Sequence, residues 1–315
     1  MRLPCDHQSL KLAAQALRDG QLVSFPTETV YGLGADATND KAVASIYEAK
    51  GRPSFNPLIA HIASLEKAKD IADFTPLAEE IAAKFWPGAV TLVLPLKTPS
   101  TISKLVTAGL ETIALRLPAP EIARQLLTEA AIPVAAPSAN LSGGISPTLA
   151  RHVEADLADK CRYILDGGPC ERGLESTIID CTTNKAIILR PGPVTLEMLE
   201  KALGDFEVSH NDIHNDHNPS APGQLTSHYA PSKSLRLNAQ SKQADETFIG
   251  FGDVKNADFN LSLSGDLTEA AANLFAILHE ADKTDGQVIA VSPIPEQGLG
   301  IAIGDRLKRA AADKG

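Results

Sequence analysis

The sequence places fixed positive charge beside a flexible glycine in YEAKGRPSFNPLIAHI, residues 47–62. Lys50 and Arg52 flank Gly51, two prolines follow, and a short apolar run leads to His61. A glycine lets the backbone approach a ligand closely, and two adjacent cations attract negative charge. The segment therefore predicts a loop that binds an anion.

Three further polar clusters adjoin predicted strand ends or tight turns. They are PTETVYGLG at 26–34, APSANLSGGISPT at 136–148, and ESTIID at 175–180 followed by RPG at 190–192. Hydroxyls, an amide and a helix N-terminus together suit phosphate oxygens. Each cluster alone is more often a simple turn, and a lone arginine such as Arg116 more often pairs with a carboxylate. The four together favour a small anionic substrate plus a polyphosphate.

Familiar nucleotide and metal motifs do not occur in the sequence. It contains no G-x-x-x-x-G-K-[ST], and G-F-G at 250–252 lacks the third glycine of a dinucleotide fingerprint. His210, His214 and His217 would share a helical face, but their Asn/Asp-rich surroundings favour a solvated linker. We therefore expect no metal held by protein side chains.

Composition narrows the class of protein further. The 315-residue chain has a formal net charge of −10, which argues against a protein that coats phosphate backbones, although a cleft can carry a local positive field. No apolar run approaches the ~20 residues of a membrane span, and the N-terminus has no apolar core of a signal peptide. The four cysteines form no C-x-x-C pair. These features predict a cytoplasmic protein that does not contact membranes.

The elements that must position the clusters mix helices and strands. Apolar spacing predicts a helix over 9–19, and Asn39 is a candidate cap for a second helix that leads into Lys50. Strand-like runs recur at QLVSF, PLIAHI, VTLVLP, TIALRLP, IPVAA, RYILD, STIID and AIILR. Because strands and helices do not alternate strictly, we expect an α/β (α+β) fold with a twisted mixed sheet.

Helix starts and domain limits follow from local signals. Helix starts are predicted at four positions: Thr75-Pro76, Ala119-Pro120, Ser146-Pro147 and Thr195, the last helix closed by Gly204. Residues 206–235, rich in Asn, Asp, His, Pro and Ser, indicate a linker after a first domain of residues 1–205. Residues 236–315 predict a small Rossmann-like βαβα domain.

The quoted motifs resemble one family closely. PTETVYGLG, KGRPxxNPL with His61, APSAN-x-SG with SPT, ESTIID and LRPG are similar to the YrdC-type threonylcarbamoyl-AMP synthases over residues 8–204. The HYAP at 228–231 and the small C-terminal domain resemble the long form of that family. The resemblance implies a YrdC-like twisted, open sheet with a large concave cleft. It also implies a nucleotidyltransferase that converts L-threonine, bicarbonate and ATP to threonylcarbamoyl-AMP and pyrophosphate, with Mg²⁺ accompanying ATP.

The resemblance also implies site residues. The signature pairs, implied to be catalytic, fall at Lys50 with Arg52 and Ser138 with Asn140. The positions implied to bind threonine are Thr29, His61, Arg116, Ala136 and Ser176. The positions implied to bind ATP are Arg52, Asn56, Thr112, Ser138, Ser146, Arg190 and Tyr229. Because Tyr229 lies in the linker, the linker is expected to fold over the cleft as a lid that excludes water.

The implied chemistry agrees with the residue types. A threonine carbamate is already an oxyanion, so its attack on the α-phosphate of ATP needs positioning and fixed positive charge more than a strong base. The product would feed modification of tRNA beside the anticodon, with a tRNA-modifying threonylcarbamoyl transferase complex as its acceptor and little direct tRNA binding.

The sequence is also compatible with two other functions. One is an RNA-binding protein that uses the positive cleft, although few aromatic residues are available for base stacking. Another is a carbamoyl-transfer enzyme with a different acceptor. The stretch Gln224–Ser227 departs from long-form relatives, which often carry cations there, so we expect the lid to close without a phosphate contact from this stretch.

Overall fold

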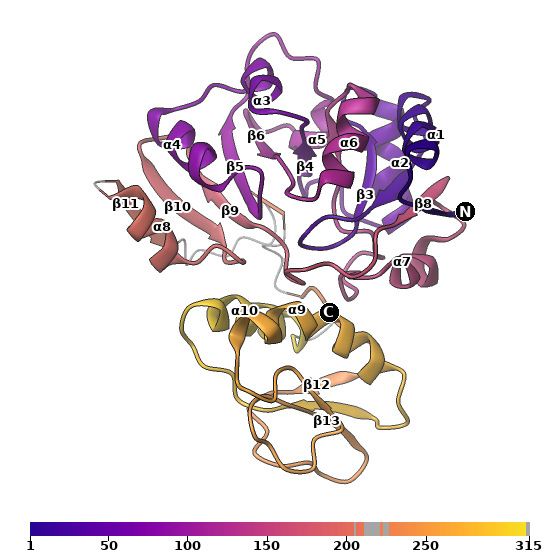
Figure 1. The fold of residues 1–315 in the computed structure, drawn as a ribbon, viewed down its shortest axis with the longest axis vertical. Helices are drawn as coiled ribbons and strands as arrows, with labels where there is room; N and C mark the ends of the chain where they lie inside the picture. Colours follow the sequence, from indigo (N-terminus) through magenta and orange to yellow (C-terminus); the bar gives the residue numbers. More distant parts are fainter. Residues whose placement is uncertain (205, 211–220, 223–226, 313–315) are drawn as a thin grey trace.

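The computed structural model describes residues 1–204, 206–210, 221–222 and 227–312. These residues form a large upper domain and a small lower domain in Figure 1. The large domain contains strands β1 (Arg2–Pro4), β2 (Val23–Phe25), β3 (Gly32–Asp36), β4 (Ile59–His61), β5 (Val90–Pro95), β6 (Thr112–Arg116), β7 (Val134–Ala135), β8 (Tyr163–Asp166), β9 (Thr177–Asp180), β10 (Lys185–Arg190) and β11 (Glu207–His210). Its helices are α1 (His7–Arg18), α2 (Asp40–Lys50), α3 (Leu65–Ile71), α4 (Pro76–Phe85), α5 (Lys104–Thr107), α6 (Glu121–Ala130), α7 (Ala150–Leu157) and α8 (Leu196–Leu203).

The large sheet is mixed, as the irregular order of elements predicted. Its strands follow the order β1-β8-β2-β3-β7-β4-β6-β5-β9-β10-β11. Pairs such as β4/β6 and β5/β9 run parallel, whereas β2/β3, β5/β6 and β9/β10 run antiparallel. Because neighbouring strands run in both directions, carboxyl and amino ends of strands lie side by side at one edge of the sheet. Loops that are distant in the sequence can therefore share a site.

Local capping explains several helix boundaries. The Asn39 side chain accepts from the backbone N–H groups of Lys41 and Ala42 and starts α2, as predicted. Thr75 and Thr195 cap α4 and α8 in the same way, and Gly204 ends α8. The predicted apolar face of α1 is buried, and α1 packs against α6 beside β2.

Two local predictions differ from the structure. The helix expected at Ser146-Pro147 begins only at Ala150, because Ser146 Oγ donates to Glu175 and the Pro147 carbonyl accepts from the Tyr31 N–H. Residues 207–210, interpreted as linker, form β11 and pair in parallel with β10. The large sheet therefore continues past the expected end of the first domain.

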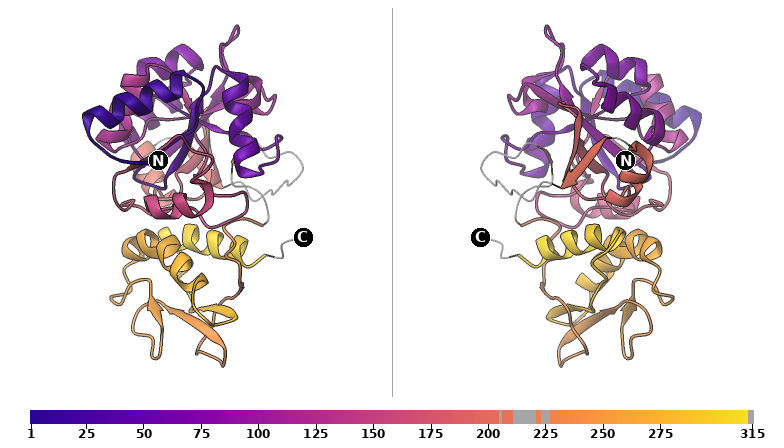
Figure 2. Two further views of the ribbon diagram at one scale, coloured as in Figure 1. Left: turned by 90° about the vertical axis from the view of Figure 1, so that its right-hand side faces the viewer. Right: turned by 90° about the vertical axis from the view of Figure 1, so that its left-hand side faces the viewer.

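The small domain has a four-stranded parallel sheet. Its order is β12-β15-β13-β14, from β12 (Ser234–Arg236), β13 (Glu246–Gly250), β14 (Phe259–Asn260) and β15 (Val288–Val291). Helices α9 (Leu267–Asp282) and α10 (Leu299–Ala310) lie between this sheet and the large domain, as Figures 1 and 2 show.

The two domains share a hydrophobic core. Val30, Ile145 and Leu174 of the large domain cluster with α9 residues that include Leu274 and Phe275. Gly173 allows this close approach, since a Cβ there would lie 2.4 Å from the carbonyl oxygen of Ala272 in α9. The helices of the small domain therefore pack directly against loops of the large one. Among the described residues, no helix has the length and apolarity to cross a membrane.

Candidate active site

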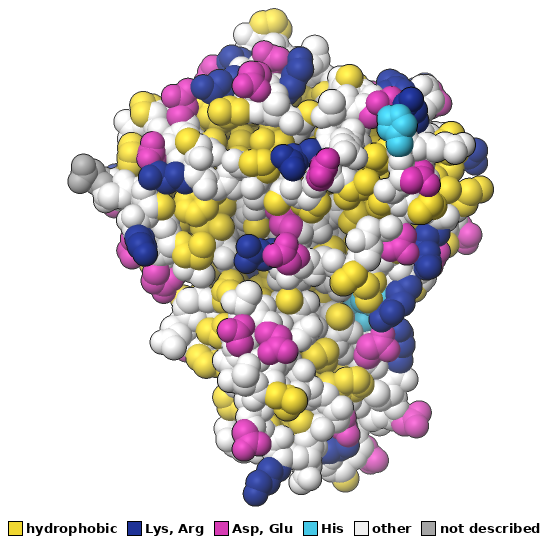
Figure 3. Space-filling model, in the orientation of Figure 1, with side chains coloured by type: hydrophobic (Ala, Val, Ile, Leu, Met, Phe, Trp, Pro, Cys, Tyr) yellow, Lys and Arg dark blue, Asp and Glu magenta, His cyan; other side chains and the backbone are white. Residues whose placement is uncertain are grey.

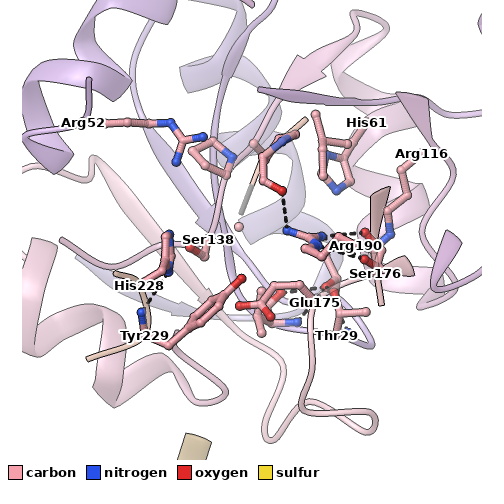
Figure 4. Close-up of a pocket in the computed structure, with 17 residues that line it drawn as sticks. Thr29, Arg52, His61, Arg116, Ser138, Glu175, Ser176, Arg190, His228 and Tyr229 are labelled. Carbon is pink, nitrogen blue, oxygen red and sulfur yellow. Dashed lines mark hydrogen bonds between the residues drawn. The ribbon is translucent and has the colours of Figure 1, made fainter. Parts of the chain in front are cut away.

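A buried pocket collects most of the predicted site residues where the large domain meets the linker (Figure 4). The space between atoms at this site, part of it open to solvent, is about 550 Å³. Its lining contains Thr27, Thr29, Val30, Gly32, Arg52, Ile59, His61, Arg116, Ala136, Pro137, Ser138, Glu175, Ser176, Arg190, Pro222, His228 and Tyr229. Three arginines thus enclose a space also lined with hydroxyl groups.

Strand ends place these side chains. His61 ends β4 and Arg116 ends β6, and the two residues are paired in register across these parallel strands. Arg190 ends β10, and Ser176 immediately precedes β9, which runs antiparallel to β10. Carboxyl ends of strands are a common location for ligands in α/β proteins. The clusters noted in the sequence therefore converge because their strands are neighbours in one sheet.

Arg116 is held by a carboxylate. Its Nη2 lies 2.8 Å from Glu28 Oε1, with 4% and 5% of the two side chains exposed, and its Nε donates to the carbonyl of Gly88. Glu28 Oε2 in turn accepts from the Ala119 N–H. Because a buried ion pair fixes both partners, Arg116 presents its remaining guanidinium edge in one orientation. A lone arginine such as Arg116 was expected to pair with a carboxylate. The structure shows that pairing, and Arg116 lines the pocket as well.

Arg52 and Arg190 are bonded mainly to carbonyl groups. Arg52 Nη2 donates to Pro57 O at 3.0 Å, while Arg190 Nη2 donates to Ser176 O at 2.9 Å and Arg190 Nη1 to Pro222 O. Burial, with a smaller effect of neighbouring Arg190, lowers the pKa of Arg52 to about 10. Burial likewise lowers the pKa of Arg190, with Arg306 nearby adding to the effect. Both cations thus sit where an incoming anion would be favourable.

Lys50 and Asn140 lie behind the pocket wall. The Lys50 ammonium donates to the carbonyl of Ser138 at 2.7 Å and to that of Asn140, and its side chain does not line the pocket. Burial, with Arg52 nearby, lowers the pKa of Lys50 well below its ordinary value. Asn140 Nδ2 donates to the carbonyls of Leu141 and Gly144. The two residues therefore shape the loop that presents Ser138.

His61 and Asn56 are among the site side chains that have unused hydrogen-bonding atoms. Within the described part of the chain, His61 Nδ1 and both side-chain atoms of Asn56 are buried without a hydrogen-bond partner. Burial, and the charge of nearby Arg116, lower the pKa of His61 to about 3, so its ring is neutral. Buried unpaired polar atoms are costly and often mark a place that a ligand completes. Asn56 adjoins Arg52, which donates to its carbonyl.

Three of the predicted ATP positions, Asn56, Thr112 and Ser146, lie outside the pocket lining. Ser146 is fully buried next to the pocket and donates to Glu175 at 2.5 Å. Thr112 begins β6, at the end opposite to Arg116, and lines a separate surface depression together with Glu111 and Thr182. A strand rises about 3.3 Å per residue, so Thr112 is on the order of 13 Å from Arg116 along β6.

The described linker residues close one side of the pocket. Pro222, His228 and Tyr229 line it, and Tyr229 is only 1% exposed. The His228 ring lies against the Tyr229 ring at 4.1 Å, and His228 Nδ1 accepts from the Tyr229 N–H. Burial, and then Arg52, lower the pKa of His228 well below 6.5, so this ring is neutral too. Of the stretch that departs from long-form relatives, 224–226 lie outside the described residues.

Sequence reasoning did not assign several residues of this site. Glu28 and Glu175 stood in the quoted motifs PTETVYGLG and ESTIID but received no role. His228 was visible in HYAP, beside the assigned Tyr229. Arg306 of α10 had no local signal, although its partner Glu175 lies in the pocket between Tyr229 and Thr29 in Figure 4.

The described residues offer little for a metal ion. They contain no group of three or more His, Cys, Asp or Glu side chains arranged to hold one. The carboxylate that lines the pocket, Glu175, is bonded to Ser146 and Arg306. Mg²⁺ that accompanies a nucleotide is bound largely by phosphates and water, and this donor set is compatible with such an ion. His214 and His217 lie outside the described residues.

Comparisons with known proteins agree with the geometry. A family profile described as "Telomere recombination" matches residues 15–192, and one described as "Threonylcarbamoyl-AMP synthase, C-terminal domain" matches residues 194–312. A Bacillus subtilis protein named threonylcarbamoyl-AMP synthase is 41% identical, covering 96% of this chain and 92% of that protein. A Pyrococcus abyssi protein of the same name is 42% identical, with 96% and 94% covered.

Solved structures show the same fold. The crystal structure described as P. abyssi Sua5 complexed with L-threonine is similar with a TM-score of 0.90 at 39% identity, covering 99% of this chain and 97% of that one. The structure of Escherichia coli YciO, at 20% identity and a TM-score of 0.54, covers 61% of this chain and shares the fold of its large domain.

Proposed function

The chain belongs to the threonylcarbamoyl-AMP synthase family, and from this premise we propose how its pocket carries out the reaction of that family. The protein is an enzyme that makes an adenylate: L-threonine, bicarbonate and ATP give threonylcarbamoyl-AMP and pyrophosphate. The observation that carries the mechanism is the convergence of Arg52, Arg116 and Arg190 on one buried pocket. Such a pocket suits two substrates that are both anions.

We propose that threonine binds at the Arg116 end of the pocket. Its P. abyssi relative was crystallised with L-threonine. The proposed contacts are Thr29, His61, Arg116, Ala136 and Ser176, which all line the pocket. The guanidinium of Arg116, oriented by Glu28, would bind the amino-acid carboxylate, and His61 Nδ1 would bind the hydroxyl that valine lacks.

ATP is proposed to occupy the rest of the pocket. The proposed contacts are Arg52, Asn56, Thr112, Ser138, Ser146, Arg190 and Tyr229. Four of them, Arg52, Ser138, Arg190 and Tyr229, line the pocket. The unpaired amide of Asn56 supports a ligand beside Arg52. Thr112 and Ser146 are the least direct of the set, because one lies at the far end of β6 and the other already donates to Glu175.

The chemistry then follows from charge and position. Threonine's amine combines with bicarbonate to give a carbamate and water. A carbamate oxygen attacks the α-phosphate of ATP, the bond from that phosphorus to the bridging oxygen breaks, and pyrophosphate leaves. Arg52 and Arg190 offset the repulsion between carbamate and polyphosphate, while Ser138 orients phosphate oxygens. The Lys50 and Asn140 hydrogen bonds keep the Ser138 loop in place. Mg²⁺ bound to ATP would spread phosphate charge further.

The linker supplies water exclusion in this proposal. Tyr229 is buried against the pocket, and burial, with nearby Glu175, raises the pKa of its phenol, so it remains a hydrogen-bond donor. Closure by Pro222, His228 and Tyr229 would protect an adenylate that hydrolyses easily. The expected limits of 1–205, 206–235 and 236–315 shift with the strands: we propose that the first domain extends through β11 to His210 and that the small domain begins with β12 at Ser234.

The proposed product is a substrate for a further protein complex. We propose that threonylcarbamoyl-AMP passes to a tRNA-modifying threonylcarbamoyl transferase complex in the cytoplasm and that this chain itself binds tRNA weakly. On the face of the molecule that Figure 3 shows, acidic and basic side chains are intermixed rather than gathered in a basic band. The family assignment supports the synthase and not the RNA-binding alternative.

Release of pyrophosphate tests the proposed reaction. The purified protein with ATP and Mg²⁺ should release pyrophosphate only when L-threonine and bicarbonate are both present, and a labelled threonine should appear in an adenylate. Pyrophosphate release that is indifferent to threonine would refute the assignment.

A further inference from the structure

Arg306 of the small domain reaches the pocket wall of the large domain. Its side chain is 0% exposed, and its Nε lies 2.8 Å from Glu175 Oε2. Nη2 donates to the carbonyl of Pro191 at 2.9 Å, and Nη1 pairs with neighbouring Asp305. One guanidinium of α10 thus bonds to two loops of the other domain. These contacts connect segments 131 and 115 residues apart in the chain.

Glu175, the partner of Arg306, is part of the pocket lining. Within the described lining of the pocket it is the one carboxylate among three arginines. Its Oε1 accepts from Ser146 Oγ, and its Oε2 faces Arg306. The proposed reaction brings a carbamate and a polyphosphate into this space. An uncompensated buried carboxylate would repel both of them, because charges interact strongly where water is excluded.

Arg306 also contacts the linker. Its guanidinium carbon lies 5.3 Å from the centre of the Tyr229 ring, a cation–π distance. The Tyr229 ring also lies near the ring of Phe275 of α9, with ring centres 5.5 Å apart. Tyr229 lines the pocket, so the small domain determines the position of a pocket wall through these two residues.

We propose that Arg306 is a positioning residue for adenylation, which neutralises Glu175 and seats Tyr229 so that the small domain completes the ATP site. This inference rests on the proposed function. It gives the small domain a role in catalysis through a residue that touches neither substrate. The proposal has a specific consequence. Without Arg306, ATP binding should weaken largely because the charge of Glu175 is no longer compensated.

A double-mutant cycle tests that consequence. The variants are Arg306→Met, Glu175→Gln and the two combined, with Lys308→Met as the matched control, since Lys308 lies on the same helix and is 70% exposed. ATP affinity is measured by calorimetry and pyrophosphate release by steady-state kinetics. We expect Arg306→Met to weaken ATP binding 10- to 100-fold, with the control unchanged. Adding Glu175→Gln should recover at least tenfold.

Other outcomes separate the possibilities. If the double variant binds ATP no better than Arg306→Met, neutralisation of Glu175 is refuted and Arg306 merely joins the domains. Should Arg306→Met fail to fold, Arg306→Lys takes its place in the same cycle, because it keeps the charge but loses the fork that reaches Glu175 and Pro191 together. Calorimetry needs no turnover, so wild-type protein that binds ATP without threonine-dependent pyrophosphate release would refute the proposed function and leave the cycle interpretable.

Discussion

Replacing Arg52 with methionine should separate stability from function. The change keeps most of the apolar stem and removes the charge. A pKa lowered from 12.5 to about 10 means that the folded protein disfavours this charge by about 3 kcal/mol, at about 1.4 kcal/mol per pH unit. The unliganded Arg52→Met variant lacks the buried charge, so this destabilisation of the folded protein is absent from it.

The relief is partly offset by lost hydrogen bonds. Arg52 donates to the carbonyls of Asn56 and Pro57, and the Asn56 carbonyl keeps a second donor, the Tyr47 hydroxyl. Leaving a buried acceptor unpaired costs about 1–3 kcal/mol. The two effects nearly cancel, so the unliganded Arg52→Met variant should be within about 1 kcal/mol of wild type or slightly more stable.

Binding of ATP should respond in the opposite direction. A hydrogen bond to a charged group contributes about 1.5–3 kcal/mol, so losing the Arg52–phosphate contact should weaken ATP binding about 10- to 150-fold. Urea unfolding without ligand and calorimetric titration with ATP measure the two quantities. Arg162→Met, at an exposed position over the Tyr163 ring, is the control for the same change.

Two results would contradict this reasoning. A loss of more than about 2 kcal/mol in the unliganded variant would mean that Arg52 is mainly structural, as its carbonyl contacts alone would suggest. Unchanged ATP affinity would mean that its charge does not face the nucleotide. Buried charges kept at a cost to stability are expected at functional sites, and this variant measures that cost directly.

Two further predictions concern the amino-acid site and the response to pH. Serine, which lacks only the methyl group of threonine, should be used with a kcat/KM about 10- to 200-fold lower, and valine should be worse because it leaves His61 Nδ1 unpaired; efficient valine use would contradict the site. Burial lowers the pKa of His61 and, helped by the adjacent His279 ring, that of His152 to about 3. As the pH falls towards 5 the unfolded chain therefore binds protons that the folded chain does not, and each histidine should remove about 2 kcal/mol of stability between pH 8 and pH 5, most of it below pH 6.5. Urea unfolding at both pH values should show a smaller loss for His152→Gln than for wild type, and equal losses would contradict the assignment.

Much of the site could be predicted because its clusters follow strands. Apolar runs such as PLIAHI and TIALRLP indicate strands, and a polar residue at the end of each lies at a sheet edge. The resemblance assigned His61 and Arg116 to the threonine site, and the structure places both at strand ends that the sheet brings into register. The register itself depends on strand order, which no local pattern contains. The family resemblance supplied what periodicity did not.

The failed local predictions have one physical origin, which is tertiary competition for the same polar groups. Ser146 followed by proline has the form of a helix start, but its hydroxyl is bonded to Glu175 from a distant loop. Residues 207–210 have the composition of a linker, yet their backbone groups pair with β10. Arg306 could not be connected with Glu175 in advance, since a separation of 131 residues is bridged only after two domains pack.

The partners of the pocket cations differ in a way that bears on where each substrate binds. Arg52 and Arg190 donate mainly to carbonyls, which satisfy hydrogen bonds without cancelling the charge. Arg116 instead faces the carboxylate of Glu28, and Arg306 faces that of Glu175. The field available to an anion is therefore strongest near Arg52 and Arg190, where a polyphosphate needs it, and weaker near Arg116, where a single carboxylate needs mainly orientation. Had Arg52 and Arg190 been paired with carboxylates of their own, the pocket would hold the same number of arginines and yet attract ATP far less.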